Sequence, residues 1–306
     1  MEAFRLAMGQ PWAITEEALD ALVSMSLSAA SYGSRPAAKD AFERYGDVAV
    51  LPIRGVITHH GDMWSWLFGE STVDNLGNQF RAAMADDSVK AIILDIDSPG
   101  GTVAGTGEFA DEVLKARGKK PVVSVANASA NSAAYWIGAA SDAFYATPSA
   151  LVGSVGVYML HVDYSQAMDE AGIKPSYVAA GKYKVEGNPY EPLGDEARDH
   201  LQSIVDDSYG RFVHGVARGR RVSEAKVRNG FGQGRALPAK AALAAGMVDG
   251  IKTLEWVIDH ASSVKASGAP EEPVAEGVAQ TPVADDEGQK RLGMLRLAGL
   301  RALEAI

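Results

Sequence analysis

The stretch VKAIILDIDSPGGTVAG, residues 89–105, joins an almost unbroken apolar run to a Ser-Pro-Gly-Gly sequence. An apolar run without polar alternation predicts a strand of a parallel sheet whose two faces are both covered. The Gly-Gly pair lies just before an expected helix, where backbone N–H groups can face a ligand. The same dipeptides are common in tight turns, so this stretch by itself favours a plain turn.

Apolar strands and helices alternate on both sides of this stretch. The alternation predicts right-handed βαβ units, and therefore an α/β fold of repeated strand–helix units. The expected strands are residues 48–57, 89–97, 120–127, 143–148, 153–160 and 176–181. The expected helices are residues 71–87, 103–117, 130–142, 163–171, 193–220, 222–229 and 238–246.

Both ends of the chain differ in character from this central part. PWAITEEALDALVSM predicts an amphipathic helix that begins near Thr15 with acidic residues in its first turn. Residues from about 266 to 289 are rich in Pro, Gly, Ala and acidic residues and lack aromatic residues, which is typical of a disordered linker. The last residues form either a docking helix or a frayed terminus. The expected division is an N-terminal helical extension (1–44), one large domain (45–262), a disordered linker (263–289) and a short amphipathic tail (290–306).

The composition narrows the functional classes. The 306-residue chain is 47% hydrophobic and 22% charged, as soluble globular proteins are, and its net charge of −10 argues against nucleic-acid binding. It contains no cysteine, which excludes disulfides, thiolate metal sites and a cysteine nucleophile and fits a reducing compartment such as the cytoplasm. Neither a signal peptide nor a membrane-spanning segment is expected.

Ser132 lies in NSAAYWIG, residues 131–138, among small and aromatic residues without charge. One interpretation is an N-cap, because serine often precedes an apolar helix. The other is a nucleophile held at a helix start, where backbone N–H groups point toward the substrate. Ser132 alone does not decide between them, since a nucleophile also needs a base.

Histidine and lysine are the candidate bases. None of the six histidines has the setting of a catalytic-triad member, and His59 and His60, after a strand end, are expected in a polar loop. Neither an HExxH motif nor a His/carboxylate cluster indicates a metal. AGKYKVEGNPYEPLGD, residues 180–195, offers Lys182 and Lys184. A lysine acts as a base near neutral pH only if its pKa falls by roughly 3 units, which burial can impose, whereas a loop lysine is by itself usually a surface charge.

Several motifs in one order carry a resemblance to a known family. They are DIDSPGGTVAG, NSAAYWIGAASD, GSVGVYM and GKYKVEGNPYEPL. The chain resembles the Ser–Lys peptidases of the signal peptide peptidase A family, in the Clp protease/crotonase superfamily. It is more closely similar to the head-maturation (capsid) proteases of lambda-type tailed phages. The resemblance covers about residues 45–260 and implies a Clp protease/crotonase-like fold and a Ser-Lys peptidase domain over 45–262.

The resemblance also implies roles for individual side chains. Ser132 of NSAAYWIG corresponds to the nucleophile of a serine endopeptidase, and Lys184, the second lysine of GKYK, to its general base. Ser154 of GSVGV corresponds to a serine that orients the lysine.

The oxyanion hole that the resemblance implies consists of backbone groups. It uses the N–H of Gly101, which follows Gly100 in the Gly-Gly turn, and the N–H of Ala133 after the nucleophile. Ala133 and Ala134 replace the paired glycines that are usual in the bacterial enzymes, but only their backbone groups are needed. No metal or organic cofactor is implied.

Phage relatives imply a role in capsid maturation. The expected substrates are the scaffold, coat or portal proteins of a procapsid, and the chain itself. Family members form homo-oligomeric rings, in some of which neighbouring subunits supply the serine and the lysine. The expected location is the host cytoplasm or the procapsid, without nucleic-acid or membrane partners.

Two alternatives to the maturation protease stay open. One is a soluble signal-peptide-peptidase-like enzyme that degrades short apolar peptides, and the other is an inactive crotonase-fold assembly module. A crotonase acting on acyl-CoA is disfavoured, because no candidate acid pair lies beside the Gly-Gly turn.

Overall fold

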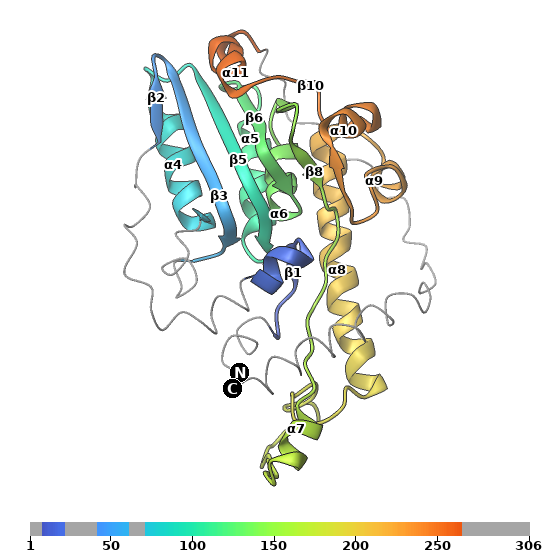
Figure 1. The fold of residues 1–306 in the computed structure, drawn as a ribbon. Helices are drawn as coiled ribbons and strands as arrows, with labels where there is room; N and C mark the ends of the chain where they lie inside the picture. The colour runs from blue at the N-terminus through green and yellow to red at the C-terminus, as the bar shows by residue number, and fades with distance from the viewer. Residues whose placement is uncertain (1–7, 22–41, 61–70, 265–306) are drawn as a thin grey trace. The chain divides into compact units, whose positions relative to one another are not determined.

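A computed structural model describes residues 8–21, 42–60 and 71–264 (Figure 1). The chain separates into two units, 1–271 and 272–306, and all described residues lie in the first. The expected linker, beyond its first two residues, and the expected tail therefore lie outside the described residues. The helix expected from Thr15 is seen over residues 16–21, where the description stops.

Strands and helices alternate between residues 71 and 146, as expected for this part of the chain. The strands are β1 (Trp12–Ile14), β2 (Glu43–Tyr45), β3 (Val48–Thr58), β4 (Ser71–Thr72), β5 (Ala91–Thr102), β6 (Val122–Asn131), β7 (Ala143–Ala146), β8 (Leu151–Gly153), β9 (Ala236–Pro238) and β10 (Gly250–Ile251). The helices are α4 (Val73–Ala85), α5 (Thr106–Ala116), α6 (Ala133–Ala139), α7 (Ser165–Glu170), α8 (Asp195–Arg220), α9 (Glu224–Gly230), α10 (Ala239–Ala245) and α11 (Leu254–His260), followed by a 3-10 turn, η2 (Ala261–Ser263).

The described strands form one mostly parallel sheet, with the main order β10-β7-β6-β5-β3-β2. Figure 1 shows β3, β5 and β6 side by side, and all three run parallel. The edge strand β2 pairs antiparallel with β3. This mixed α/β architecture with a parallel centre confirms the fold class at that level.

Alternate residues of β5 point into two hydrophobic cores. Ile92, Leu94 and Ile96 belong to a large core that also contains residues of α4, α5, α6 and α8. Ile93 faces a second core on the other side of the sheet, to which Val257 of α11 contributes. Because both faces are covered, the first four positions of this strand, residues 91–94, are all apolar, and this explains the apolar run in the sequence.

The Ser-Pro-Gly-Gly sequence continues β5, so the expectation of a tight turn was wrong. Gly100 and Gly101 pair with Val56 and Ile57 of β3, and the strand extends to Thr102. A Cβ on Gly101 would lie 1.8 Å from the carbonyl oxygen of Ile57. Glycine is therefore required here because two backbones approach each other closely. A Gly-Gly pair can serve this purpose or form a tight turn, and the sequence alone does not distinguish the two.

Two other expected strands also differ. β8 ends at Gly153, and the residues that follow it contribute only isolated bridges at Tyr158 and Leu160. Residues 176–181 form no strand, and Val178 is fully exposed. This β-prone segment has no neighbouring strand within the described ranges, and a lone strand cannot complete a ladder.

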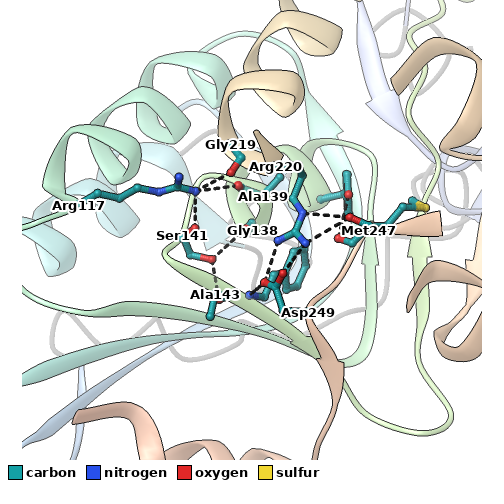
Figure 2. Close-up of polar contacts among 12 residues, drawn as sticks. Arg117, Gly138, Ala139, Ser141, Ala143, Gly219, Arg220, Met247 and Asp249 are labelled. Atoms are coloured by element: carbon teal, nitrogen blue, oxygen red, sulfur yellow. Dashed lines mark hydrogen bonds and ion pairs between the residues drawn. The ribbon is translucent and has the colours of Figure 1, made fainter. Parts of the chain in front are cut away.

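Arg117, directly after α5, anchors the C-terminal end of α6 (Figure 2). Its buried guanidinium donates to the carbonyl oxygens of Ala140 at 2.9 Å, Ala139 at 3.3 Å and Ser141, and to Gly219 of α8 at 2.8 Å. Carbonyls at a helix end lack partners within the helix, so Arg117 satisfies several of them at once. Burial lowers the pKa of Arg117 to about 10, which leaves the guanidinium charged at neutral pH.

Arg220 and Asp249 form a second anchor nearby (Figure 2). Arg220 donates to both carboxylate oxygens of Asp249, at 2.7 and 2.9 Å, and Asp249 also accepts from the backbone N–H of Phe144 at 2.7 Å. The hydroxyl of Tyr135 in α6 donates to the carbonyl oxygen of Met247 at 3.0 Å. The helix α6 is therefore held from two sides.

Asp249 is expected to make the protein sensitive to acid. Burial alone would raise the pKa of its carboxyl, but the hydrogen bonds and charge of Arg220 outweigh burial and hold it below its ordinary value of 3.8. The ion pair therefore contributes its full stability above that value, and the contribution is lost as the pH falls through the lowered pKa. In thermal unfolding between pH 6 and pH 2.5, the wild type should lose more stability below pH 4 than Asp249→Asn does. Parallel curves would contradict this.

None of the described helices combines the length and the apolar character needed to cross a bilayer.

Candidate active site

Ser132 lies at the junction between β6 and α6 in a strained backbone conformation. Its φ of 54° and ψ of −118° are unfavourable for a residue with a Cβ. The backbone is held there because its N–H donates to the carbonyl of Gly153 at 2.6 Å and its carbonyl accepts from Trp136 at 3.0 Å. Strain of this kind collects at functional sites, and a serine on a sharp strand-to-helix turn has the geometry of a nucleophile elbow.

The side chain of Ser132 does not act as a helix cap. No side-chain capping hydrogen bond is made to α6, although Ser132 occupies the N-cap position. Its Oγ donates instead to the carbonyl oxygen of Gly156, at 3.4 Å, and the residue is completely buried. The geometry thus favours the nucleophile over the N-cap.

Helix α6 is buried on all sides, which fixes the position of Ser132. Its small residues allow close packing, and Trp136 stacks on Phe212 of α8 with ring centroids 4.8 Å apart. The first residue of the helix is Ala133, whose N–H is one of the expected oxyanion donors.

Gly100 lies beside Ser132, and Gly101 follows it in β5. Gly100 has a φ of 108°, and a Cβ on it would lie 2.9 Å from the Cβ of Ser132 and 3.0 Å from the carbonyl oxygen of Asn131. Ser132, Ala133 and both glycines are therefore brought together, although they come from two different strand ends.

Ser154 belongs to the loop around the nucleophile. Two carbonyls close to it in the sequence, those of Gly153 and Gly156, accept hydrogen bonds from Ser132. Ser154 has a φ of 52°, and its own N–H donates to the carbonyl of Arg235 at 3.0 Å. It lines a pocket of about 550 Å³, together with Gly156 and Tyr158.

Lys184 is not brought to Ser132 within one chain. It lies exposed in a turn, and the neighbouring residues Lys182 and Tyr183 both bind Glu196 at the start of α8, at 2.9 and 2.6 Å. Phe212, which contacts α6, lies 16 residues further along α8, or roughly 24 Å at 1.5 Å per residue. The serine and the lysine therefore do not form a dyad in a single copy.

Lys182 differs from Lys184 in its environment. Hydrogen bonds to Tyr183 and then to Glu196 raise the pKa of Lys182, which favours its charged form. Lys184 makes no side-chain hydrogen bond or ion pair with the residues that the structure describes. A lysine that is free of partners is the better candidate for transfer to another environment.

His59, His60 and Asp74 form a cluster that the sequence did not indicate. Their ligand atoms lie within 4.8 Å of one another, and they are the candidate metal ligands among the described residues. The Nδ1 of His60 is 2.5 Å from Asp74, and this hydrogen bond lowers the pKa of Asp74. The pairing of β4 with β3 brings them together, which no spacing motif in the sequence could reveal.

The structure adds a feature that sequence reasoning missed. Strand β1 pairs with β5 directly across the Gly-Gly pair. Three residues are too few for a periodic pattern, and only Trp12 and Ile14 are of types that favour strands.

Comparison with known proteins gives a family match over the part of the chain that contains Ser132. The profile of Peptidase family S49 matches residues 115–267, half of the chain's 306 residues. The match includes Ser132, Ser154 and Lys184 but begins after the Gly-Gly pair.

Individual relatives include viral and bacterial proteins. The head-tail preconnector protein GP5 of Enterobacteria phage P21 is 35% identical over 185 residues, 60% of this chain and 36% of that protein. The capsid assembly protease C of Escherichia phage lambda is 32% identical over 200 residues, 65% of this chain and 45% of that protein. Protease 4 of Haemophilus influenzae is 27% identical over 239 residues, 74% of this chain and 36% of that protein. The chain thus spans less than half the length of these relatives.

Proposed function

Because the chain belongs to peptidase family S49, we propose that it is a serine endopeptidase in which Ser132 is the nucleophile. The observation that carries the proposal is Ser132 itself, which has a strained backbone, makes no capping hydrogen bond to α6 and lies beside the Gly100–Gly101 pair. We further propose that residues 45–262 are the peptidase domain and that its fold is of the Clp protease/crotonase type. The parallel strands β3, β5, β6 and β7 support that assignment.

The proposed reaction is acyl transfer to serine. Neutral Lys184 takes the proton of Ser132 as its Oγ attacks the scissile carbonyl, and returns it to the leaving amine. Backbone N–H groups of Gly101 and Ala133 stabilise the oxyanion, which is worth about 3 kcal/mol for each donor. Water then hydrolyses the acyl-enzyme with the same base, and Ser154 orients the lysine. This mechanism uses no metal or organic cofactor.

In this proposal, Lys184 reaches the Ser132 of a neighbouring copy in a homo-oligomeric ring. The segment that carries Lys184 also exposes large apolar side chains, namely Ile173, Tyr177, Val178 and Tyr183. A cluster of exposed apolar side chains is typical of a protein–protein interface. A neighbouring copy would bury both this segment and the lysine, and burial disfavours a charged ammonium group.

The proposed substrates are the scaffold, coat or portal proteins of a phage procapsid, and the chain itself. The support is the similarity to the capsid assembly protease C of phage lambda and to GP5 of phage P21. This role would place the reaction in the host cytoplasm. The similarity to Protease 4 supports the alternative, a housekeeping peptidase that needs no capsid protein.

A mixing experiment tests the shared dyad and the substrate together. Ser132→Ala and Lys184→Ala are each expected to leave the cognate coat and scaffold proteins uncut, as measured by intact mass. After unfolding and refolding together in equal amounts, about one site in four combines an intact serine with an intact lysine from different copies, so cleavage should return.

Lys182→Ala is the matched control, because it removes a lysine two positions away that is paired with Glu196. It should cut the same proteins at a rate close to that of the wild type. If the mixture stays inactive, the dyad is not shared. If the wild type cuts apolar peptides but neither capsid protein, the housekeeping peptidase replaces the maturation role.

A further inference from the structure

Beyond the end of β6, at Ser132, there is a gap one strand wide between β5 and the segment after β8, which we call the slot. β6 lies beside β5 as far as the pair Ser98–Ala130, and beside β8 as far as the pair Asn131–Gly153. At Ser132 the chain then leaves the sheet and enters α6. β5 and the segment after β8 continue without it, so the position between them is free for another strand.

Strand β1 fills this slot. It runs antiparallel to β5, with Trp12 opposite Thr102 and Ile14 opposite Gly100. On its other side, Trp12 donates to the carbonyl of Tyr158 at 2.9 Å and accepts from its N–H at 3.1 Å. Strand β1 is thus paired with β5 along one side and is hydrogen-bonded through Trp12 to Tyr158 on the other, as a bound peptide would be.

The register places the carbonyl of Ala13 at the proposed oxyanion site. Thr15 donates to Pro99 at 3.1 Å and Val103 donates to Pro11 at 3.4 Å, two residues to either side of Ala13. Hydrogen-bonded pairs recur every two residues in an antiparallel ladder, so the pair Ala13–Gly101 is of the same kind. The N–H of Gly101 therefore faces the Ala13 carbonyl.

The same carbonyl lies beside the nucleophile. The point where a Cβ of Gly100 would lie is 2.3 Å from the carbonyl oxygen of Ala13 and 2.9 Å from the Cβ of Ser132. The carbonyl of Ala13 is therefore close both to a proposed oxyanion donor and to the serine that would attack it.

Side chains of β1 alternate between two environments. Ala13 is fully buried and belongs to the large core, whereas Trp12 and Ile14 pack with Val56 in a separate apolar cluster. The slot therefore accommodates a small residue at one position and large apolar residues on both sides of it.

We propose that β1 is a built-in occupant of the substrate slot, with the Ala13–Ile14 peptide bond held where the bond to be cut in a substrate lies. A substrate must displace it. The matching substrate is an extended peptide with an alanine-sized residue before the cut bond and large apolar residues next to it. This inference rests on the proposed function, since it takes Ser132 as nucleophile and the Gly101 N–H as oxyanion donor.

Peptide binding tests the occupancy without any catalysis. The probe is a fluorescent octapeptide, QPWAITEE, which repeats residues 10–17, and the protein is the full chain carrying Ser132→Ala. Adding Ala13→Pro removes the N–H that faces Gly101 and so releases β1. By fluorescence anisotropy, the double variant should bind the peptide about tenfold tighter or more, because its slot is open. Equal affinities would overturn the inference.

Two controls guard this comparison. Asp20→Asn changes an exposed residue of the same segment and should leave the affinity unchanged. If circular dichroism shows that Ala13→Pro does not fold, Ala13→Leu replaces it, because leucine overfills the site of a fully buried alanine. In the Ser132→Ala chain, saturating peptide should also speed hydrogen exchange at the amides of residues 12–14. Unchanged exchange at saturation would count against displacement.

Cleavage separates this inference from the proposed function. In chains with Ser132 intact, Ala13→Pro should cut the peptide between Ala and Ile faster than the wild type does. If the Ala13→Pro change tightens peptide binding but no chain cuts the peptide, the peptidase proposal is refuted and the occupancy of the slot by β1 is supported. Equal cutting rates in both chains, dependent on Ser132, would refute the occupancy and leave the peptidase standing. Loss of residues 1–13 from the wild type, but not from Ser132→Ala, would be self-cleavage at the Ala13–Ile14 bond and would support the inference.

Discussion

Ser132→Ala is expected to lower kcat for peptide hydrolysis by about 10⁴- to 10⁶-fold. The covalent step needs the Oγ, and no other described hydroxyl occupies the strained turn at the start of α6. The fold should change little, because the Oγ makes one hydrogen bond of 3.4 Å, to Gly156. The measurement is the rate of cutting of QPWAITEE by mass spectrometry, with thermal unfolding as the check on folding.

Ser129→Ala is the matched control for this variant. Ser129 lies three residues earlier on β6, and its Oγ donates to the carboxylate of Asp97 at 3.1 Å, away from the nucleophile. It should keep close to full activity. A Ser132→Ala protein that retains more than about one per cent of the wild-type rate would remove Ser132 from the mechanism, since such residual rates do not survive loss of a serine nucleophile.

Arg117→Met is expected to cause the largest loss of stability, about 3 kcal/mol or more. The methionine fills much of the volume but leaves the carbonyls of Ala139, Ala140, Ser141 and Gly219 without their donor. Each buried acceptor left unpaired costs about 1–3 kcal/mol where water cannot reach it. The melting temperature should fall by about 6–12 °C, at 2–4 °C for each kcal/mol in a domain of this size.

Lys115→Met provides the comparison, because it removes a positive charge two residues before Arg117, at an exposed position of α5. Its melting temperature should stay within about 2 °C of the wild-type value, as surface substitutions usually do. Arg117→Lys should fall between the two, since one ammonium group cannot reach all four carbonyls. Equal melting temperatures for Arg117→Met and Lys115→Met would show that water replaces the guanidinium.

Sequence reasoning was strongest where one local pattern has one physical cause. The apolar run in β5 predicted a doubly covered parallel strand, and Ile92 and Ile93 indeed face different cores. The local pattern at Ser132 left two interpretations, an N-cap and a nucleophile, and the family resemblance implied the second. The strained φ of 54° at Ser132 then favoured the nucleophile, and this angle depends on tertiary contacts that no sequence pattern encodes.

Sequence reasoning failed where distant segments meet. The Gly-Gly pair was interpreted as a turn because the close approach of Ile57 comes from another strand. β1 owes its conformation to the slot between β5 and Tyr158, and its own three residues carry little preference. The base role of Lys184 stays a prediction, because much of the length of α8 separates it from Ser132 within one chain.

The separation of Ser132 from Lys184 by much of the length of α8 has a consequence for when the enzyme works. If each site needs two copies, a chain diluted below the dissociation constant of its oligomer is inert, and the rate at low concentration rises with the square of the protein concentration. The activity of each chain then depends on the local concentration of other copies. Such an enzyme does not cleave other proteins while its copies are dilute, and it becomes active where many copies are packed into one small volume.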